Sequence, residues 1–420
     1  MPHALAQAVE IVTTALAVAG MGYFLASLLA AHIFRRQRHA LPAEFAPGVT
    51  ILKSLKGLDP GMMDAFRSHC RQSYAGEFEL LFGVASPADP AAAAVDALKA
   101  EFPERAIRLV ECPQQLGTNG KVSTLVQLAA QARYDYLLIN DSDITVSPRY
   151  LERVMPCFAR DPHSTSGAKA LPESTALDAR AETGTLQNGT ERAQVGLVTA
   201  LYRGRAHGTL ASRLEALGIA TEFMGGVLLS KWMEGGLHYG LGSTLAVRRE
   251  ALERSGGLLP LVNYLADDYE LGARVAKAGY RVEVCAEVVE TNLPEYEWRG
   301  FFDHQLRWLR TVRDVRPGGY FGLIFTYGLG WALLNVVASG LSPLSLWLLA
   351  LSFFLRLSQA MSVGALVLGD HQVLPNLWLL PFRDAIAMGL WVAGFAGDTI
   401  VWRGERFALQ KGKLIKGQSG

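Results

Sequence analysis

The chain has 420 residues, and its 40 basic side chains almost balance its 39 acidic ones, so the formal net charge is +1. That balance gives no indication of a nucleic-acid partner, and we expect none. Half of the residues are apolar and the mean hydropathy is +0.18, high for a soluble domain alone and low for a protein built only of membrane helices. The composition therefore predicts a soluble domain joined to membrane segments.

Residues 11–34, "IVTTALAVAGMGYFLASLLAAHIF", form the first apolar segment of the chain. About 20 such residues are long enough to cross a bilayer as a helix. The basic cluster "RRQRH" follows at 35–39, and no Lys or Arg precedes the segment. We therefore predict a transmembrane anchor over residues 1–40 rather than a cleaved signal peptide, with the next domain in the cytoplasm by the positive-inside rule.

From about residue 47 to residue 316, short apolar runs alternate with helical stretches. The predicted strands are 49–52, 78–85, 106–112 and 134–140, and the predicted helices between them are 62–72, 91–102 and 121–133. This alternation predicts an α/β fold with a mostly parallel sheet and helices on both faces. Such sheets bind their ligands beyond the carboxyl ends of the strands.

Two acidic residues, Asp141 and Asp143, come directly after the last of these strands. Adjacent carboxylates repel each other, and they are tolerated where a cation bridges them or solvent screens them. Magnesium or manganese, held by one or two carboxylates and completed by substrate phosphates, suits this short turn better than a closed cage of protein ligands. The alternative is a solvated turn in which an Asp caps a helix beginning near Pro148. The position at the strand end favours the metal–phosphate interpretation.

Further polar side chains stand in short motifs on both sides of this turn. Upstream, "TILKSLKG" carries Lys53, and "LGTNGKVSTL" carries Asn119 and Lys121 just before a predicted helix. Downstream, "YLADDYELG" puts Asp267 and Asp268 at the start of another helix. The amphipathic, basic stretch "HQLRWLRTVR" then precedes the second apolar block.

The C-terminal block contains three apolar segments, residues 320–341, 344–368 and 377–402. The second carries Arg356 and the third carries Asp384, and because charge inside a membrane usually faces a partner, we expect these two side chains to pair. Three crossings would place the basic tail outside the cytoplasm, against the positive-inside rule. We therefore expect the third segment to be re-entrant or interfacial.

Taken in order, these motifs resemble the inverting GT-A glycosyltransferases of the processive-synthase-like superfamily. The chain is most similar to ceramide glucosyltransferases and to the bacterial hopanoid biosynthesis-associated glycosyltransferases. The likeness extends over almost the whole chain, through "LKSLKG", "DSD", "VGLVTALYRGR", "GLGSTLAVRREAL", "LADDYELG", "HQLRW" and the apolar block. It implies the GT-A fold, a divalent cation, Mg or Mn, as cofactor, a UDP-sugar donor and a membrane lipid acceptor.

The resemblance also implies roles on the donor side. Asp141 and Asp143 match the metal and nucleotide-diphosphate motif, and Asp268, the second acid of "ADDY", matches the general base. Lys53 is a candidate contact to the nucleotide sugar. The alternative for Asp268 is an acid placed at a helix N-terminus by the helix dipole, a role that Asp267 could take instead.

The stretch "HQLRW" matches the end of the family's (Q/R)xxRW motif, which binds the diphosphate and the acceptor. Arg307 and Trp308 supply the final pair, and Arg307 is also a candidate nucleotide-sugar contact. His304 stands where the family has Gln or Arg, and this departure puts its role in doubt. An interfacial amphipathic helix over residues 299–316 is a compatible interpretation, since a lipid acceptor would arrive at that interface.

A second departure lies after the strand at 78–85. The family places there an Asp that contacts uracil, whereas this chain has Ser86 in "GVASPADPA". A serine hydroxyl still accepts a hydrogen bond from a uracil N–H, with a loss on the order of 1 kcal/mol relative to a charged acceptor. Asp89 either compensates for this loss or caps the following helix.

A polar stretch at 163–193 departs from the family pattern as an inserted surface loop, and its sequon at Asn188 would not be used in the cytoplasm. We divide the chain into an anchor (1–40), a GT-A domain (41–298), an amphipathic helix (299–316), transmembrane helices (317–403) and a basic tail (404–420).

The sequence therefore predicts a multi-pass enzyme of the inner, cytoplasmic membrane with its catalytic domain in the cytoplasm. It would transfer a single sugar, glucose or N-acetylglucosamine, from a UDP-sugar to a lipid hydroxyl such as that of ceramide or a hopanoid. One alternative is a processive polysaccharide synthase, although the chain has few spans to enclose a channel. Another is a catalytically silent binding protein, suggested by Ser86 alone.

Overall fold

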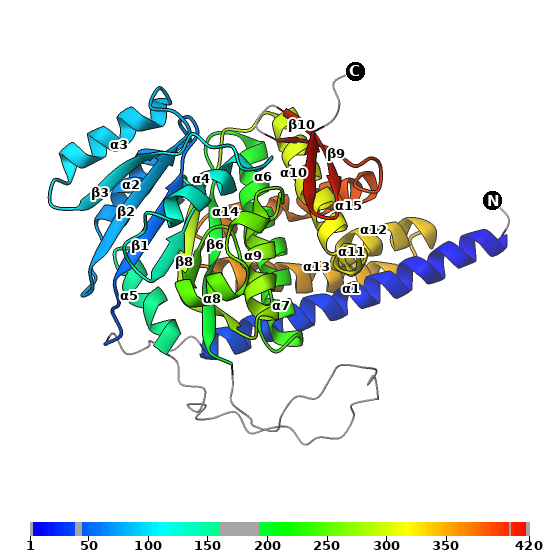
Figure 1. Cartoon of the computed structure of the whole chain (residues 1–420). Coiled ribbons are helices and arrows are strands. Elements are labelled where there is room, and N and C mark those ends of the chain that lie inside the picture. Colours follow the sequence, from blue (N-terminus) through cyan, green and yellow to red (C-terminus); the bar gives the residue numbers. More distant parts are fainter. Residues whose placement is uncertain (1–2, 38–43, 160–192, 403–404, 417–420) are drawn as a thin grey trace, which may run out of the picture.

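An eight-stranded sheet with the order β3-β2-β1-β4-β7-β6-β8-β5 forms the centre of the computed structural model, which describes residues 3–37, 44–159, 193–402 and 405–416 (Figure 1). The strands are β1 (Val49–Ser54), β2 (Phe78–Val84), β3 (Ala106–Glu111), β4 (Tyr136–Ile139), β5 (Ile144–Thr145), β6 (Val195–Arg205), β7 (Leu245–Arg248) and β8 (Arg281–Asn292). The first four are mutually parallel, as are β6 and β8, whereas β7 and β5 run antiparallel to their neighbours. The predicted α/β fold with a mostly parallel sheet is confirmed.

The register of the sheet brings the ends of β1 and β4 to one edge. These strands are buried apolar runs, and Leu52 of β1 pairs with Ile139 of β4. Lys53 and Asn140, which follow Leu52 and Ile139 in the sequence, therefore lie side by side at the carboxyl edge of the sheet. This is the edge at which a parallel sheet binds its ligands.

Helices pack against this sheet and carry residues to its carboxyl edge. Those of the α/β domain are α2 (Met62–Cys70), α3 (Pro90–Glu101), α4 (Gly120–Ala129), α5 (Tyr150–Val154), α6 (Leu210–Gly218), α7 (Met224–Met233), α8 (Arg249–Arg254) and α9 (Asp267–Lys277). Helix α4 packs on β1 and β2, while α9 packs on β6 and β8. Asn119 caps α4 by accepting a hydrogen bond from the Val122 N–H at 3.2 Å. The starts of α4 and α9 are thus fixed near the ends of β1 and β4.

Two helices in the described part of the chain are long and apolar enough to cross a membrane, judged by length and composition. One comprises residues 4–37 of α1 (His3–Gln37), and the other comprises α13 (Pro343–Ala360) with its extension to Val367. A pair bent by 56°, Pro317–Thr326 and Gly328–Ala338 (α12), would add a third if it forms one span. A Cβ on Gly20 would lie 2.2 Å from the Gly328 Cα, so α1 and α12 cross at a distance that only glycine permits.

The third apolar segment, residues 377–402, is not one helix. Helix α15 (Leu380–Ala393) ends well before residue 402, and β9 (Thr399–Trp402) follows it. The expected pair within the block is confirmed, because the Arg356 guanidinium donates two hydrogen bonds of 2.8 Å to the buried Asp384 carboxylate.

The basic tail also has regular structure that the sequence interpretation missed. Strand β9 pairs with β10 (Glu405–Gln410), which pairs with β11 (Lys413–Lys416) in an antiparallel sheet. The reason is a two-residue alternation that buries Ile400, Phe407, Leu409 and Leu414 in a small core. The described residues 405–416 of the predicted basic tail therefore form a folded element.

This C-terminal sheet docks on loops of the α/β domain. The Leu414 N–H donates to the Asn263 carbonyl at 2.7 Å, and the Leu265 N–H donates to the Gly412 carbonyl at 3.0 Å. The Thr118 hydroxyl donates to the Leu414 carbonyl at 3.2 Å. The loop that contains Thr118 lies directly before the "GK" of α4, and the loop that contains Asn263 and Leu265 lies directly before Asp267. The predicted insert, apart from residue 193, and the sequon at Asn188 lie outside the described residues.

Candidate active site

The turn after β4 is held by two lysines. The Lys121 ammonium lies 2.8 Å from Asp141 Oδ1, and the Lys53 ammonium donates to the Asp141 carbonyl at 3.0 Å. Lys53 is 1% exposed, and burial lowers its pKa to about 7 against the opposing effect of Asp143 and Asp141. Lys53 therefore fixes the main chain of the turn, and its direct contact with a nucleotide stays a prediction.

Asp143, the second acid of the turn, is held from β8. One carboxylate oxygen accepts a hydrogen bond from the Thr291 hydroxyl, and the Asp143 carbonyl accepts from the Asn292 side chain at 2.9 Å. Burial first, and the neighbouring Asp141 next, raise the pKa of Asp143 to about 6. Its surroundings therefore disfavour the charged form of the carboxylate, and a bound cation would stabilise that form.

Asp267 and Asp268 begin α9 and come close to the same turn. Lys121 lies 3.3 Å from Asp267 Oδ2 as well as next to Asp141, so one ammonium bridges the two acidic motifs. Asp268 Oδ1 accepts a hydrogen bond from the Tyr269 N–H at 2.8 Å. Burial first, and Asp267 next, raise the pKa of Asp268 to about 6.

Gly242, in the "GLGSTL" motif, lies between the two acidic motifs. A Cβ at this glycine would lie 3.0 Å from Asp268 Oδ2 and 3.6 Å from Asp141 Oδ2. The glycine therefore leaves the space over which both carboxylates converge. The sequence interpretation named neither Gly242 nor Lys121 as a site residue, and only the "GLG" spacing and the position of Lys121 before a helix pointed to them.

Of the two residues considered for the nucleobase side, Asp89 has the structural role. It caps α3 by accepting from the Ala91 N–H at 2.9 Å, and it also accepts from the Gly57 N–H at 3.0 Å. The exposed Ser86 accepts from the Ala88 N–H at 3.2 Å. The structure therefore favours the cap over compensation by Asp89.

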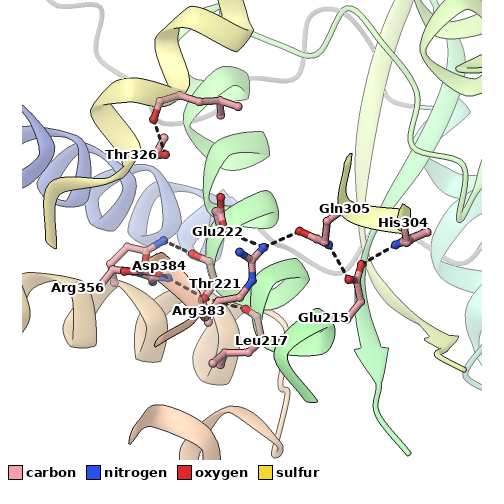
Figure 2. A network of polar contacts seen from close by, with 12 residues as sticks. Glu215, Leu217, Thr221, Glu222, His304, Gln305, Thr326, Arg356, Arg383 and Asp384 are labelled. Carbon is pink, nitrogen blue, oxygen red and sulfur yellow. Dashed lines mark hydrogen bonds and ion pairs between the residues drawn. The ribbon is translucent and has the colours of Figure 1, made fainter. Parts of the chain in front are cut away.

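The motif "HQLRW" lies on α10 (Trp298–Val315), confirming the predicted helix. The His304 ring lies 5.5 Å from the Trp308 ring, and Trp308 packs edge-on against Phe223 at 5.3 Å. Arg307 on the same helix is half-buried. His304 also belongs to the network of polar contacts drawn in Figure 2.

The basic side chains in the second half of α10 bind the protein itself. Arg310 donates to the Ala396 carbonyl at 2.8 Å, and Arg313 donates to the Gly397 carbonyl at 2.9 Å. Both arginines thus hold the turn before β9. This part of the helix has a tertiary role that the interfacial interpretation did not include.

A mixed sheet of this order, with acidic residues after β4 and at the start of α9 meeting at its carboxyl edge, is the arrangement of a glycosyltransferase with the GT-A fold. A family model described as glycosyl transferase family 21 matches residues 12–167 and 179–415. The chain belongs to this family. The resemblance to ceramide glucosyltransferases is confirmed, and the chain is a glycosyltransferase of that type.

Two relatives in Caenorhabditis elegans are similar along most of their length. Ceramide glucosyltransferase 3 is 24% identical, over 96% of this chain and 83% of the relative. Ceramide glucosyltransferase 1 is 22% identical, over 91% and 76%. A solved mannosyltransferase from Pyrobaculum calidifontis, in complex with GDP-Man and Mn²⁺, is 18% identical with a TM-score of 0.49, over 92% of this chain and 97% of that one.

Proposed function

We propose that the protein is a membrane-bound, inverting glycosyltransferase that moves one sugar, glucose or N-acetylglucosamine, from a UDP-sugar to the hydroxyl of a membrane lipid. The convergence of Asp268 and Asp141 over Gly242 carries the proposal. A proton acceptor and a diphosphate site then lie on either side of the space for one sugar. The two ceramide glucosyltransferases named above support ceramide as the first acceptor to test. A hopanoid alcohol is the second.

The reaction is a single displacement. The acceptor oxygen bonds to the anomeric carbon while the bond from that carbon to the diphosphate oxygen breaks, and UDP departs with the bonding electrons. Asp268 takes the hydroxyl proton, which makes the oxygen nucleophilic. Because attack and departure occur on opposite faces of the sugar, the configuration inverts and no covalent enzyme intermediate is required.

A divalent cation suits the Asp-Ser-Asp turn. Asp143 would hold it, with Asp141 as the second candidate, since the pKa of Asp143 is raised by burial and by Asp141. In the described part of the chain, no group of three or more His, Cys, Asp or Glu side chains is placed to hold a metal. The short Asp-Ser-Asp turn suits an ion held by one or two carboxylates and completed by donor phosphates. When bound, it would offset charge on the departing diphosphate.

Other side chains position the acidic residues and bind the substrates. Lys53 and Lys121 fix the turn and keep Asp141 close to Asp267. Arg307 and Trp308, carried over from the family motif, bind the diphosphate and the acceptor. The catalytic domain lies on the cytoplasmic side of the inner membrane. UDP-sugars are made in the cytoplasm, and a lipid hydroxyl reaches the domain from the bilayer.

A direct assay tests this function. Purified protein in detergent micelles is incubated with Mg²⁺ or Mn²⁺, a short-chain ceramide, and UDP-glucose or UDP-N-acetylglucosamine, and lipid products are identified by mass spectrometry. A single-sugar β-linked lipid is the expected product of inversion from an α-linked donor. A polymer would favour a processive synthase, and failure of all combinations together with retained UDP binding would favour a silent binding protein.

A further inference from the structure

The C-terminal hairpin, residues 405–416, closes in a tight turn at its tip. Lys411 has φ +50° and Gly412 has φ +78°, so two consecutive residues adopt the left-handed conformation. Such a turn matches the twist of the two strands that it joins. A Cβ on Gly412 would lie 3.1 Å from the Tyr264 ring, so a side chain there would be strained and would also press on the loop before α9. The glycine therefore allows the tip to approach the α/β domain closely.

Helix α10 anchors this tip, and the two elements lie side by side (Figure 1). Both carboxylate oxygens of Asp314 accept main-chain hydrogen bonds, one from the Lys411 N–H at 3.2 Å and one from the Gly412 N–H. The helix dipole disfavours an acid at the C-terminal end of a helix, and these two N–H groups compensate for that placement. The hairpin is thus tied to the helix that also carries Arg307 and Trp308.

One edge of the hairpin continues into residues 262–265, which we call the α9 loop. Tyr264 and Lys413 form an antiparallel bridge, and the Lys413 ammonium lies 5.5 Å from the centre of the Tyr264 ring. The main-chain hydrogen bonds of Leu414 and Gly412 described above lie on either side of this bridge. The α9 loop therefore pairs with β11 as a further strand would, and α9 begins two residues after it.

Residues 117–119, which we call the α4 loop, complete the contact. Asn119 is fully buried and donates twice to the α9 loop, from its N–H and from its side-chain amide, both at 2.7 Å. Thr118 contacts the α9 loop and the hairpin, because its N–H donates to the Asn263 side chain at 3.0 Å and its hydroxyl donates to the Leu414 carbonyl at 3.2 Å. Two loops and the hairpin thus share one set of hydrogen bonds.

This contact lies next to the ionic bridge of the transfer site. Lys121 follows the α4 loop by two residues, and Asp267 follows the α9 loop by two residues. The Lys121 ammonium reaches both Asp267 at 3.3 Å and Asp141 at 2.8 Å only while the two loops keep their spacing. A misplacement of about 1 Å at a site of this kind lowers a rate by roughly 100-fold. What holds the loops together therefore affects catalysis.

We propose that the C-terminal hairpin is a positioning element of the transfer site. Its docked edge holds the α9 loop against the α4 loop, which sets the distance from Lys121 to Asp267 and, with it, the direction of the Asp268 carboxylate. This role rests on the glycosyl transfer proposed above. Because the hairpin acts through the two loops, its undocking should slow the chemical step and leave UDP bound.

The test measures transfer from UDP-glucose to short-chain ceramide by variants of the full-length protein. Gly412→Val should undock the tip, because valine is strained at this φ and its side chain presses on Tyr264. We expect kcat to fall by about 10- to 100-fold and the UDP affinity, measured by calorimetry, to stay within about twofold. Lys411→Asn is the matched control in the same turn, because asparagine tolerates the left-handed conformation, and it should keep the unmodified kcat.

Further variants separate positioning from simple destabilisation. Thr118→Val removes the hydroxyl contact with Leu414 from the other side and should lower kcat in the same direction. In a Lys121→Met background, Gly412→Val should lower kcat by less than about threefold, because the bridge through which the hairpin acts is already gone. A hairpin with a structural role alone would lower kcat by the same factor in both backgrounds.

Hydrogen exchange gives a readout that does not depend on catalysis. In Gly412→Val, peptides that cover residues 117–121 and 262–268 should exchange at least about tenfold faster, while peptides from β1 and β2 keep the unmodified rate. If Gly412→Val does not fold, Asp314→Asn replaces it, since it weakens the anchor of the tip and should change kcat and exchange in the same direction.

Three results would overturn the inference. These are an unmodified kcat in Gly412→Val despite faster exchange of both loops, an equal loss of kcat in the Lys121→Met background, or unchanged exchange of both loops. If the unmodified protein transfers sugar and Gly412→Val matches it, only the positioning role fails. If the unmodified protein transfers none, the proposed function fails, and hydrogen exchange still decides whether the hairpin holds the two loops.

Discussion

The Lys121 ammonium lies 2.8 Å from the Asp141 carboxylate, although the two residues belong to different elements at the edge of the sheet. The same ammonium lies 3.3 Å from Asp267. Burial lowers the pKa of Lys121, but Asp141 and Asp267 outweigh it, so the pKa lies above its usual range and the side chain stays charged. One cation therefore sets the spacing between the donor motif and the base motif.

Replacing that cation should misplace the base. In Lys121→Met, Asp141 and Asp267 repel without a bridge, and we expect transfer to fall by about 100-fold, the effect of roughly 1 Å of misplacement. Lys121→Arg should recover part of the rate. Lys99→Met is the matched control, because Lys99 forms an exposed ion pair with Asp96 at 3.1 Å. Steady-state rates of Lys121→Met equal to those of the control would contradict a bridging role.

Changing the base should remove turnover while leaving the donor bound. Asp268→Asn keeps size and polarity but cannot take a proton, so we expect a loss of roughly 100- to 10,000-fold in kcat. UDP affinity, measured by calorimetry, should be unchanged. Asp267→Asn, which weakens the bridge to Lys121 but leaves the Asp268 carboxylate, should lose less activity than Asp268→Asn. Should Asp267→Asn be inactive while Asp268→Asn transfers sugar normally, Asp267 is the base.

The same carboxylate predicts an acid limb in the pH profile. Because burial and Asp267 raise the pKa of Asp268 to about 6, the side chain is protonated and inactive as a base at lower pH. The value of kcat/KM at saturating Mg²⁺ should therefore fall as pH drops below about 6 and approach a tenfold loss per pH unit. A rate that is flat from pH 7 to pH 5 would argue against this base.

Removing the metal ligand should abolish transfer without unfolding the protein. We expect Asp143→Asn to lower kcat by about 100-fold or more, since charge on the leaving diphosphate is no longer offset. Asp96→Asn, on the exposed face of α3, is the control. Excess EDTA should silence the unmodified protein and added Mn²⁺ should restore it. Full activity in EDTA would remove the metal from the mechanism.

The orientation of the domain can be tested with single cysteines. The four native cysteines are all buried, so they give little background labelling. Thr185→Cys, in the inserted segment, should resist an impermeant thiol reagent in intact cells, and Pro2→Cys, before α1, should react. The reverse pattern would overturn both the cytoplasmic assignment and the expectation that the sequon at Asn188 is unused.

Local patterns predicted much of this molecule. The buried runs that became β1, β2, β3 and β4 were visible in the sequence, and so was the helix that begins at Asp267. The carboxyl-edge rule placed Asp141 at a ligand site, and the family resemblance added Asp268 to it. The cost of charge in a membrane predicted the pair of Arg356 and Asp384.

Tertiary contacts account for what could not be predicted. The bridge from Lys121 to Asp267 and the pair of Glu215 with His304 join residues far apart in the chain, and no periodicity marks them. The C-terminal sheet was hidden for another reason. Its alternation of apolar residues is only a few residues long. Residues 399–402 also follow a long apolar run, so the sequence pattern assigns them to the preceding membrane segment.

The docking of that sheet constrains how the chain passes through a bilayer. Arg313 at the end of α10 pairs with Asp398, and Asp314 accepts a hydrogen bond from the Lys411 N–H at 3.2 Å. The chain thus leaves α10 and returns beside it on the same side. From this docking we predict an even number of crossings between residues 317 and 396 and, with α1 as one further crossing, chain ends on opposite sides of the membrane.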